Sequence, residues 1–152
     1  MRDGLVLRHE FVEHIPLVLE EHTVYVSVAY ATAVHRCACG CGREVVTPLS
    51  PTDWALRYDG ETISLDPSIG NWGFGCRSHY WVRRNEVQWA GRWSDEEVAA
   101  GRARDRRAKA RYYEGAEDSS AFRDLESGGA GVRVTPGSRW QRLKRWWRAR
   151  MS

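Results

Sequence analysis

The chain of 152 residues is long enough for one domain, or for one small domain with an appended tail. Its hydrophobic fraction of 42% and charged fraction of 28% are typical of a globular protein and exclude a fully disordered chain. No apolar run approaches roughly 18 residues and the N-terminus lacks the apolar stretch of a signal peptide. We therefore expect a cytoplasmic protein without a transmembrane segment.

The net charge of +3 is the sum of two unlike halves. Residues 1–100 carry 9 arginines and 14 acidic residues, whereas residues 101–152 carry 12 arginines, 2 lysines and 6 acidic residues. This asymmetry, together with a change of residue pattern at Ser94, predicts two domains. We expect a β-rich domain over residues 1–93 and a helical, Arg-rich extension over residues 94–152.

The first domain carries the signals of strands joined by tight turns. Residues 24–30 form a β-branched and aromatic run, which is typical of a strand. Asp59 and Gly60 separate two further runs and predict a two-residue hairpin turn, in which both positions need a positive φ. Arg84 and Asn85 give a weaker hairpin signal. These turns favour an antiparallel meander or a small barrel, so that the whole chain is mainly β, or α+β with its helical extension.

The extension begins with a helix signal. Ser94 is followed by three acidic residues, which is the pattern of an N-cap and a first helical turn. We expect a mostly solvated helix over residues 95–113 and a second short helix over 119–126. Residues 127–137 include a Gly-rich run and predict a flexible linker. Residues 138–151 contain no acidic residue and predict a basic helix that carries three tryptophans.

The four cysteines predict a metal site. Cys37, Cys39 and Cys41 alternate with single residues, and Cys76 follows after 34 intervening residues. Cysteines at alternate positions pair poorly as disulfides, and clustered thiolates in an intracellular protein usually bind metal. Four thiolates complete a tetrahedral, structural Zn²⁺ site. His35 and His79 are alternative ligands, and a set of buried free thiols is the competing interpretation.

A second cluster offers the parts of a Ser/His hydrolase. Ser68 lies between Pro67 and Gly70 on a predicted turn, which would expose its hydroxyl as a nucleophile for the base His79. Asp66 or Glu44 could orient the imidazole, and Asn71 could donate a hydrogen bond to the oxyanion.

The alternatives for this cluster are Ser78 as nucleophile and His35 as base. Ser78 adjoins His79, and neighbouring side chains on a strand point to opposite faces, so Ser78 is the poorer partner. The same segment is also compatible with an ordinary turn whose serine caps its own backbone. The tryptophans around it fit a hydrophobic core, and some could line a groove for an extended peptide.

Four blocks of the sequence resemble one bacterial family. These blocks are residues 35–42, 45–49, 67–72 and 76–81, and the resemblance extends over roughly residues 24–89. Members of this family, formerly of unknown function, are encoded beside prokaryotic ubiquitin-like proteins and their activating and conjugating enzymes.

The resemblance implies a zinc-binding, deubiquitinase-like serine peptidase that processes or removes the ubiquitin-like modifier. It also implies structural zinc and a place in a conjugation pathway of phage defence. The partners implied are the ubiquitin-like protein, its conjugates and the pathway's enzymes. Nothing is carried over to the extension that starts at Ser94.

Two further functions compete with peptidase activity. A noncatalytic zinc module would recruit the modifier or its conjugating enzymes without turnover. A nucleic-acid-binding zinc protein would use the arginines and tryptophans of residues 138–152, which suit phosphates and stacked bases. The basic charge belongs to the extension alone, so it is a weak argument for nucleic-acid binding by the whole chain.

Overall fold

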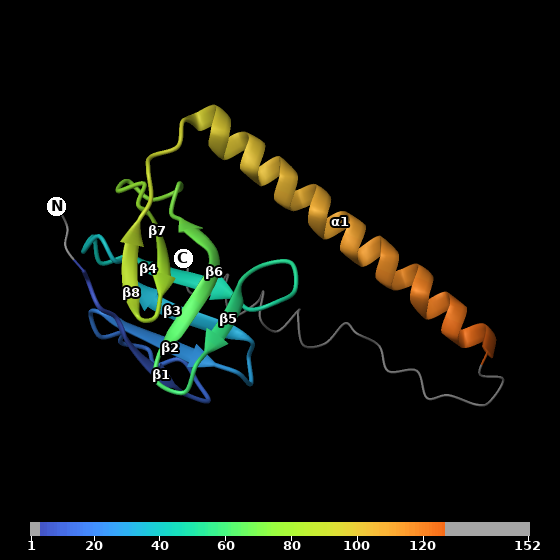
Figure 1. Ribbon diagram of the computed structural model, residues 1–152, viewed down its shortest axis with the longest axis horizontal. Coiled ribbons are helices and arrows are strands. Elements are labelled where there is room, and N and C mark those ends of the chain that lie inside the picture. The colour runs from blue at the N-terminus through green and yellow to red at the C-terminus, as the bar shows by residue number, and fades with distance from the viewer. Residues whose placement is uncertain (1–3, 127–152) are drawn as a thin grey trace. The chain divides into compact units, whose positions relative to one another are not determined.

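The computed structural model describes residues 4–126, which form two four-stranded sheets and one helix (Figure 1). The expected mainly-β fold with a helical extension is confirmed. The chain divides into two compact units, residues 1–113 and residues 114–152. The elements are β1 Arg8–Phe11, β2 Thr23–Ser27, β3 Thr32–Arg36, β4 Glu44–Pro48, β5 Ala55–Tyr58, β6 Ile63–Gly70, β7 His79–Arg83, β8 Glu86–Trp89 and α1 Asp95–Glu126.

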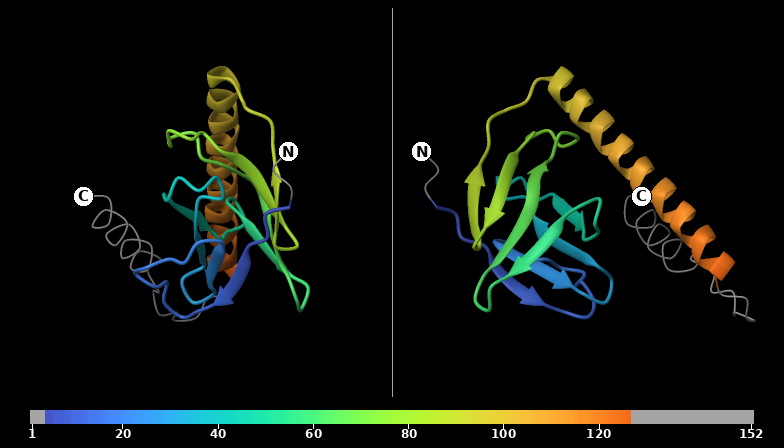
Figure 2. Two further views of the ribbon diagram at one scale, coloured as in Figure 1. Left: turned by 90° about the vertical axis from the view of Figure 1, so that its left-hand side faces the viewer. Right: turned by 45° about the vertical axis from the view of Figure 1, so that its right-hand side comes forward.

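Each sheet follows the order of its strands in the chain. The first has the order β1-β2-β3-β4 and the second β5-β6-β7-β8. All neighbouring pairs are antiparallel except β1 and β2, which pair in parallel. The expected antiparallel meander is complete in the second sheet, whereas in the first it comprises β2, β3 and β4 only, because β1 pairs in parallel. Figure 2 shows the two sheets from two further directions.

One hydrophobic core joins the two sheets. Val24 and Val26 of β2 alternate with residues that face the other way, and both are fully buried. They belong to the same cluster as Leu65 of β6 and Tyr80 and Val82 of β7, which are also fully buried. The faces that carry these side chains therefore pack against each other, and the alternate side chains of β6 and β7 lie on the opposite face of their sheet.

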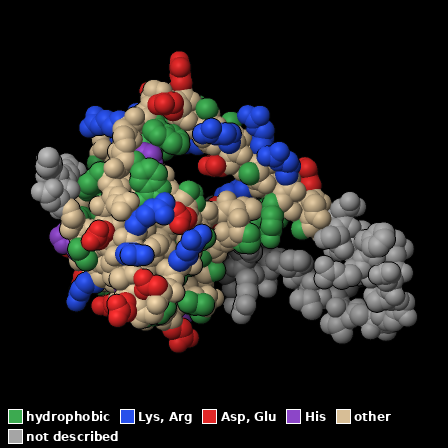
Figure 3. All heavy atoms as spheres, in the orientation of Figure 1, with side chains coloured by type: hydrophobic (Ala, Val, Ile, Leu, Met, Phe, Trp, Pro, Cys, Tyr) green, Lys and Arg blue, Asp and Glu red, His purple; other side chains and the backbone are tan. Residues whose placement is uncertain are grey.

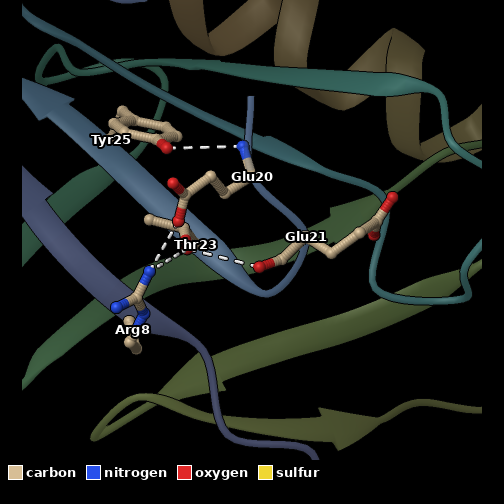
Figure 4. Close-up of polar contacts among 5 residues, drawn as sticks. All are labelled: Arg8, Glu20, Glu21, Thr23 and Tyr25. Atoms are coloured by element: carbon tan, nitrogen blue, oxygen red, sulfur yellow. Dashed lines mark hydrogen bonds and ion pairs between the residues drawn. The ribbon is translucent and has the colours of Figure 1, made fainter. Parts of the chain in front are cut away.

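The segment between β1 and β2 covers the outer face of the first sheet. Its Leu19 is buried with Tyr25 and Val34, which point away from the main core. Figure 4 shows how this segment is tied to the strands: the backbone N–H of Glu20 donates to the Tyr25 hydroxyl at 3.3 Å, and the Thr23 hydroxyl donates to the Glu21 carbonyl at 3.3 Å. This crossing segment returns the chain to the start of β2, which permits the parallel pairing with β1.

The two predicted hairpins form, and the turn of one of them differs from expectation. Arg84 and Asn85 make the tight two-residue turn, with φ values of 48° and 65°. Asp59 instead begins a four-residue connection between Tyr58 and Ile63, in which Gly60 has a positive φ. The Asp59 carboxylate accepts the backbone N–H groups of Glu61 and Thr62 at 2.9 and 2.6 Å, and this cap stabilises the longer loop.

Helix α1 starts where the sequence predicts. The Ser94 backbone N–H donates to the Glu97 carboxylate at 2.7 Å, and the Glu97 N–H donates to the Ser94 hydroxyl at 3.2 Å, which together form a capping box. The expected break between residues 113 and 119 is wrong, because α1 is continuous to Glu126. The intervening residues contain no proline and a single glycine, so nothing there ends the helix.

The predicted linker at 127–137 and the basic helix at 138–151 lie outside the described residues. Within residues 4–126, no helix has the length and apolar character needed to cross a membrane.

Candidate active site and cysteine cluster

Strands β6 and β7 bring Ser68 and His79 together on the outer face of the second sheet. Ile69 pairs with Tyr80 and Gly70 pairs with His79. Ile69 and Tyr80 are buried in the core, so the adjacent Ser68 and His79 emerge on the opposite face. Ser68 thus lies within β6 rather than on the expected turn. The register shifts between Leu65 and Ile69, and this irregularity of the strand positions Ser68 beside His79.

Both ring nitrogens of His79 have a partner. Nε2 lies 2.9 Å from the Ser68 Oγ, and Nδ1 lies 3.0 Å from the backbone carbonyl oxygen of Gly91. A carbonyl oxygen only accepts hydrogen bonds, so neutral His79 carries its proton on Nδ1. Nε2 is then the acceptor for the Ser68 hydroxyl proton. This is the arrangement that a serine nucleophile and its general base require.

Aromatic rings enclose the imidazole of His79. The ring centroids of Trp72, Trp93 and Trp81 lie 4.9, 5.1 and 5.8 Å from that of His79. Trp72 and Trp93 also stack on each other at 5.6 Å with an interplanar angle of 17°. These rings hold the imidazole in place and leave His79 only 6% exposed.

Gly70 makes this enclosure possible. A Cβ atom at Gly70 would lie 2.3 Å from Nε1 of Trp72, which is far inside contact distance. The absence of a side chain opposite His79 therefore lets the Trp72 indole lie over the strand beside the imidazole.

Ser68 and His79 open into a cavity of about 490 Å³. Trp72 and Trp93 line it near the imidazole, and Trp54 and Phe74 add further aromatic surface. A further wall comes from the first half of α1, between Val98 and Lys109, and Asp53 and Asn71 also line the cavity. A molecule that enters the cavity can therefore reach the Ser68 hydroxyl.

Two residues predicted to assist His79 lie elsewhere. The Asp66 carboxylate pairs with the Arg83 guanidinium at 2.9 Å, and the position expected for Asp66 beside Nδ1 is taken by the Gly91 carbonyl. Glu44 lies on β4 of the other sheet, where its register partner is Arg36. Neither carboxylate has a described contact with His79.

The four cysteines converge into one cluster, as the sequence predicts. Their sulfur atoms all lie within 4.8 Å of one another. The Sγ of Cys37 is 3.4 Å from that of Cys39 and 3.9 Å from that of Cys76, and the sulfurs of Cys41 and Cys76 are 3.8 Å apart. Sulfurs bound tetrahedrally at about 2.3 Å from Zn²⁺ would be separated by about 3.8 Å. The cluster therefore has the ligand set and the spacing of a closed, four-thiolate metal site.

The chain folds into this cluster through a glycine-rich loop after β3. Cys37 directly follows β3 and is 1% exposed, and its N–H donates to the Arg43 carbonyl at 2.7 Å. Gly40 and Gly42 have φ values of 87° and 78°, a conformation that favours glycine and turns the loop so that all three thiols face Cys76.

The surroundings shift the pKa values of the thiols in different directions. Burial raises the pKa of Cys37, and burial raises the pKa of Cys39 to about 12. Burial also opposes ionisation of Cys76, but hydrogen bonds from the side chain and backbone of Ser78 lower its pKa to about 7. A bound cation would favour the thiolate forms of Cys37 and Cys39, against the effect of their burial.

Ser78 and Asn71 form hydrogen bonds with the cysteine cluster. The Ser78 Oγ lies 3.0 Å from the Cys37 Sγ and 3.5 Å from the Cys76 Sγ, and the Asn71 amide donates to the same Oγ at 2.9 Å. The Asn71 amide also reaches the Cys37 Sγ at 3.7 Å. Asn71 also lines the cavity that contains Ser68 and His79, so its role as a donor to the oxyanion stays a prediction. The alternative nucleophile Ser78 lies beside the sulfurs of Cys37 and Cys76.

Neither candidate histidine joins the cluster. His35 is fully buried, its Nε2 lies 2.8 Å from the Tyr80 hydroxyl, and burial lowers its pKa to about 4. It is therefore a neutral core residue that does not line the cavity as a base. His79 has both nitrogens committed to Ser68 and Gly91.

Sequence reasoning missed three parts of the site. These are the Gly91 carbonyl, the Trp93 ring and the cavity wall formed by α1. A carbonyl belongs to every residue, so no sequence pattern identifies the one that meets an imidazole. The position of Trp93 directly before the predicted helix cap was the available signal for its role beside the site.

Comparison with known proteins identifies the family. Residues 11–90, just over half of the chain, match the family model described as "Bacterial ubiquitination-like system serine protease (BubE)". No curated protein and no solved structure matches the chain. The match spans Ser68, His79 and all four cysteines, and it stops one residue before Gly91. The chain therefore belongs to the BubE family of serine proteases of bacterial ubiquitination-like systems.

Proposed function

We propose that the protein is a Ser/His peptidase that cleaves a ubiquitin-like modifier, from its precursor or from its conjugates, in the bacterial cytoplasm. Ser68 is the nucleophile, His79 is the general base and the Gly91 carbonyl orients His79. The observation that carries this proposal is the 2.9 Å separation of Ser68 Oγ and His79 Nε2, with Nδ1 held by a group that only accepts hydrogen bonds. Membership of a serine protease family supports the same reaction.

The reaction follows from these positions. As the Ser68 oxygen attacks the carbonyl carbon of the scissile bond, its proton passes to Nε2 of His79. The imidazolium that forms keeps its Nδ1 hydrogen bond to the Gly91 carbonyl, which stabilises the positive charge. Nε2 then returns the proton to the leaving amine, and the C–N bond breaks to give an acyl-serine. A water molecule, deprotonated by Nε2, hydrolyses this ester and restores Ser68.

The four cysteines would hold Zn²⁺ as a structural ion. When bound, the ion links the end of β3 to the segment that leads into β7, because Cys37 follows β3 and Cys76 lies three residues before His79. The Ser78 hydroxyl, 3.0 Å from the Cys37 sulfur, would help to position the thiolates, and the Asn71 amide donates to this hydroxyl at 2.9 Å. Four thiolates fill a tetrahedral site, so the peptidase reaction is assigned to Ser68 and His79 alone.

The test compares single variants of the full chain in cleavage of a ubiquitin-like modifier that carries a C-terminal extension. We expect Ser68→Ala and His79→Ala each to lower kcat by at least about a thousandfold, because nucleophile and base act as a unit. Ser64→Ala is the matched control, since Ser64 lies on the same strand and its hydroxyl accepts a hydrogen bond from the Arg84 N–H. Its rate should stay within a few-fold of the wild type.

Two results would contradict the proposal. Cleavage by Ser68→Ala at the wild-type rate would exclude Ser68 as the nucleophile. Binding of the modifier by the wild-type protein without any turnover would instead identify a noncatalytic recruiting module.

A further inference from the structure

One face of α1 forms a wall of the cavity that contains Ser68. Val98, Gly101, Arg102, Asp105 and Lys109 line the cavity from successive helical turns. All belong to the compact unit of residues 1–113 that also contains both sheets. Val98 is 7% exposed, so the helix is packed against the domain near its N-terminus. Figure 3 shows the hollow between the side chains of this helix and those of the sheets.

The helix is attached to the β domain at both ends of this wall. At the N-terminal end, Trp93 stacks on Trp72, and Gly101 lies so close to Trp93 that an added Cβ would be 3.0 Å from the ring. At the other end, the Lys109 ammonium forms an ion pair with Asp53. The Asp53 side chain is 12% exposed, and its other oxygen accepts the Ser50 hydroxyl at 2.7 Å. Asp53 is therefore held in place to receive Lys109.

These two attachments fix residues 98–109 of α1 over the cavity, and we call this part of the helix the strap. An internal loop of a folded protein cannot enter sideways beneath a strap that is fixed at both ends, whereas a free chain end can enter lengthwise. The wall from Val98 to Lys109 is about 16 Å long at 1.5 Å per residue. An extended peptide rises about 3.3 Å per residue, so about five residues fit along it.

We propose that α1 restricts the peptidase to an extended chain terminus that threads between α1 and the β domain, and that the Lys109–Asp53 ion pair is the latch of this strap. The inference rests on the proposed peptidase function. The preferred substrate is a modifier precursor in which only a few unstructured residues follow the scissile bond. A folded protein attached at the same bond is cleaved slowly, because it is too large to fit between α1 and the β domain unless the Lys109–Asp53 ion pair breaks.

The experiment uses the full chain and two substrates with the same scissile sequence. The first is a ubiquitin-like modifier with a short unstructured C-terminal extension, and the second has a folded domain fused directly after the scissile bond. The measured quantity is the ratio of kcat/KM for the short extension to that for the folded fusion. The single variants are Lys109→Ala and Asp53→Asn. A double variant, Lys109→Asp with Asp53→Lys, exchanges the two charges, and Arg106→Ala on α1 is the control. Thermal unfolding establishes that each variant is folded.

For the wild type we expect a ratio of about ten or more. Loss of one partly exposed ion pair shifts an equilibrium by about three- to fivefold, so Lys109→Ala and Asp53→Asn should each lower the ratio by about that factor, by raising the rate on the folded fusion. The charge exchange should restore the wild-type ratio, and Arg106→Ala should leave it unchanged.

The outcomes separate this inference from the function on which it rests. If the wild type cleaves both substrates equally, or if neither single variant changes the ratio, the strap inference is overturned while Ser68-dependent cleavage stands. If Ser68→Ala cleaves either substrate at the wild-type rate, the proposed function itself fails.

Discussion

At the scale of single residues, the tautomer and the ring orientation of His79 depend on the two groups that face its ring nitrogens. A neutral carbonyl in place of a carboxylate fixes the tautomer and the ring orientation as an aspartate would. It supplies a dipole instead of a full charge, so it stabilises the imidazolium less strongly. The packed rings of Trp72 and Trp93 hold the imidazole in the same orientation and so assist the carbonyl.

Gly70 gives a prediction at this scale. Gly70→Ala would drive the new methyl into the Trp72 indole, because the ideal Cβ position is 2.3 Å from Nε1. A displaced indole releases the imidazole, and small displacements of catalytic groups lower rates by about a hundredfold. We therefore expect kcat to fall by about that factor, as measured in the modifier cleavage assay, without loss of metal.

The matched control for Gly70 is Gly75. A Cβ at Gly75 meets nothing within 4 Å, its backbone needs no positive φ and it is not among the residues that line the cavity, so Gly75→Ala should keep wild-type activity. Equal activity of the two alanine variants would show that the position of Trp72 has no role in the reaction.

At the scale of elements, the cysteine cluster joins the end of β3 to the start of β7. Cys76 and Ser78 lie directly before β7, which begins with His79. We therefore expect the conformation of this short segment to depend on the four sulfurs and on a metal ion bound to them. Without a cation, no shared ligand holds the four sulfurs together, and the segment before β7 is then no longer fixed to the end of β3.

Removal of the metal is the prediction that belongs to this scale. A chelator strong enough to extract thiolate-bound Zn²⁺ should lower the Tm by more than about 10 °C and abolish modifier cleavage. Added Zn²⁺ should restore both properties in the wild type but not in Cys76→Ala, with metal content measured on the same samples. A metal-free protein with an unchanged Tm and full activity would contradict a structural role for the cluster.

The elements also show how far local sequence signals reach. The helix cap at Ser94 and the hairpin at Arg84 and Asn85 were predictable, because each depends on a few adjacent residues. The stronger signal at Asp59 predicted the wrong turn, since its carboxylate caps two backbone N–H groups and so stabilises a longer loop. The break expected in α1 was wrong because a lone glycine does not end a long Ala- and Arg-rich helix.

At the scale of the whole molecule, the sequence predicted those parts of the site that consist of reactive or metal-binding side chains better than those that depend on tertiary packing. The four cysteines were recognisable because ligand identity and spacing are written in the sequence, and they do converge. Ser68 and His79 were named as a pair from their chemistry, and they lie 2.9 Å apart. Asp66 was named for the same reason but pairs with Arg83, because the sheet register decides which charges meet.

The remaining parts of the site depend on tertiary packing. The Gly91 carbonyl reaches His79 because the chain turns back beside β7 before α1, with the Ala90 N–H donating to the His79 carbonyl at 2.8 Å. The first half of α1 becomes a wall through Val98 and Lys109, which look like ordinary residues of a solvated helix. No local pattern in a mostly polar helix distinguishes these contacts from solvent exposure.

The central claim is that Ser68 is a nucleophile activated by His79, and covalent labelling tests it most directly. A fluorophosphonate phosphonylates an activated serine oxygen and releases fluoride. Cleavage by trypsin after Arg57, Arg77 and Arg83 places Ser68 on the peptide 58–77 and Ser78 on the peptide 78–83. Mass spectrometry, with fragmentation to separate Ser68 from Ser64, should find the label on Ser68 in the wild type and almost none in His79→Ala. A label on Ser78, or equal labelling of Ser68 in both proteins, would contradict the claim.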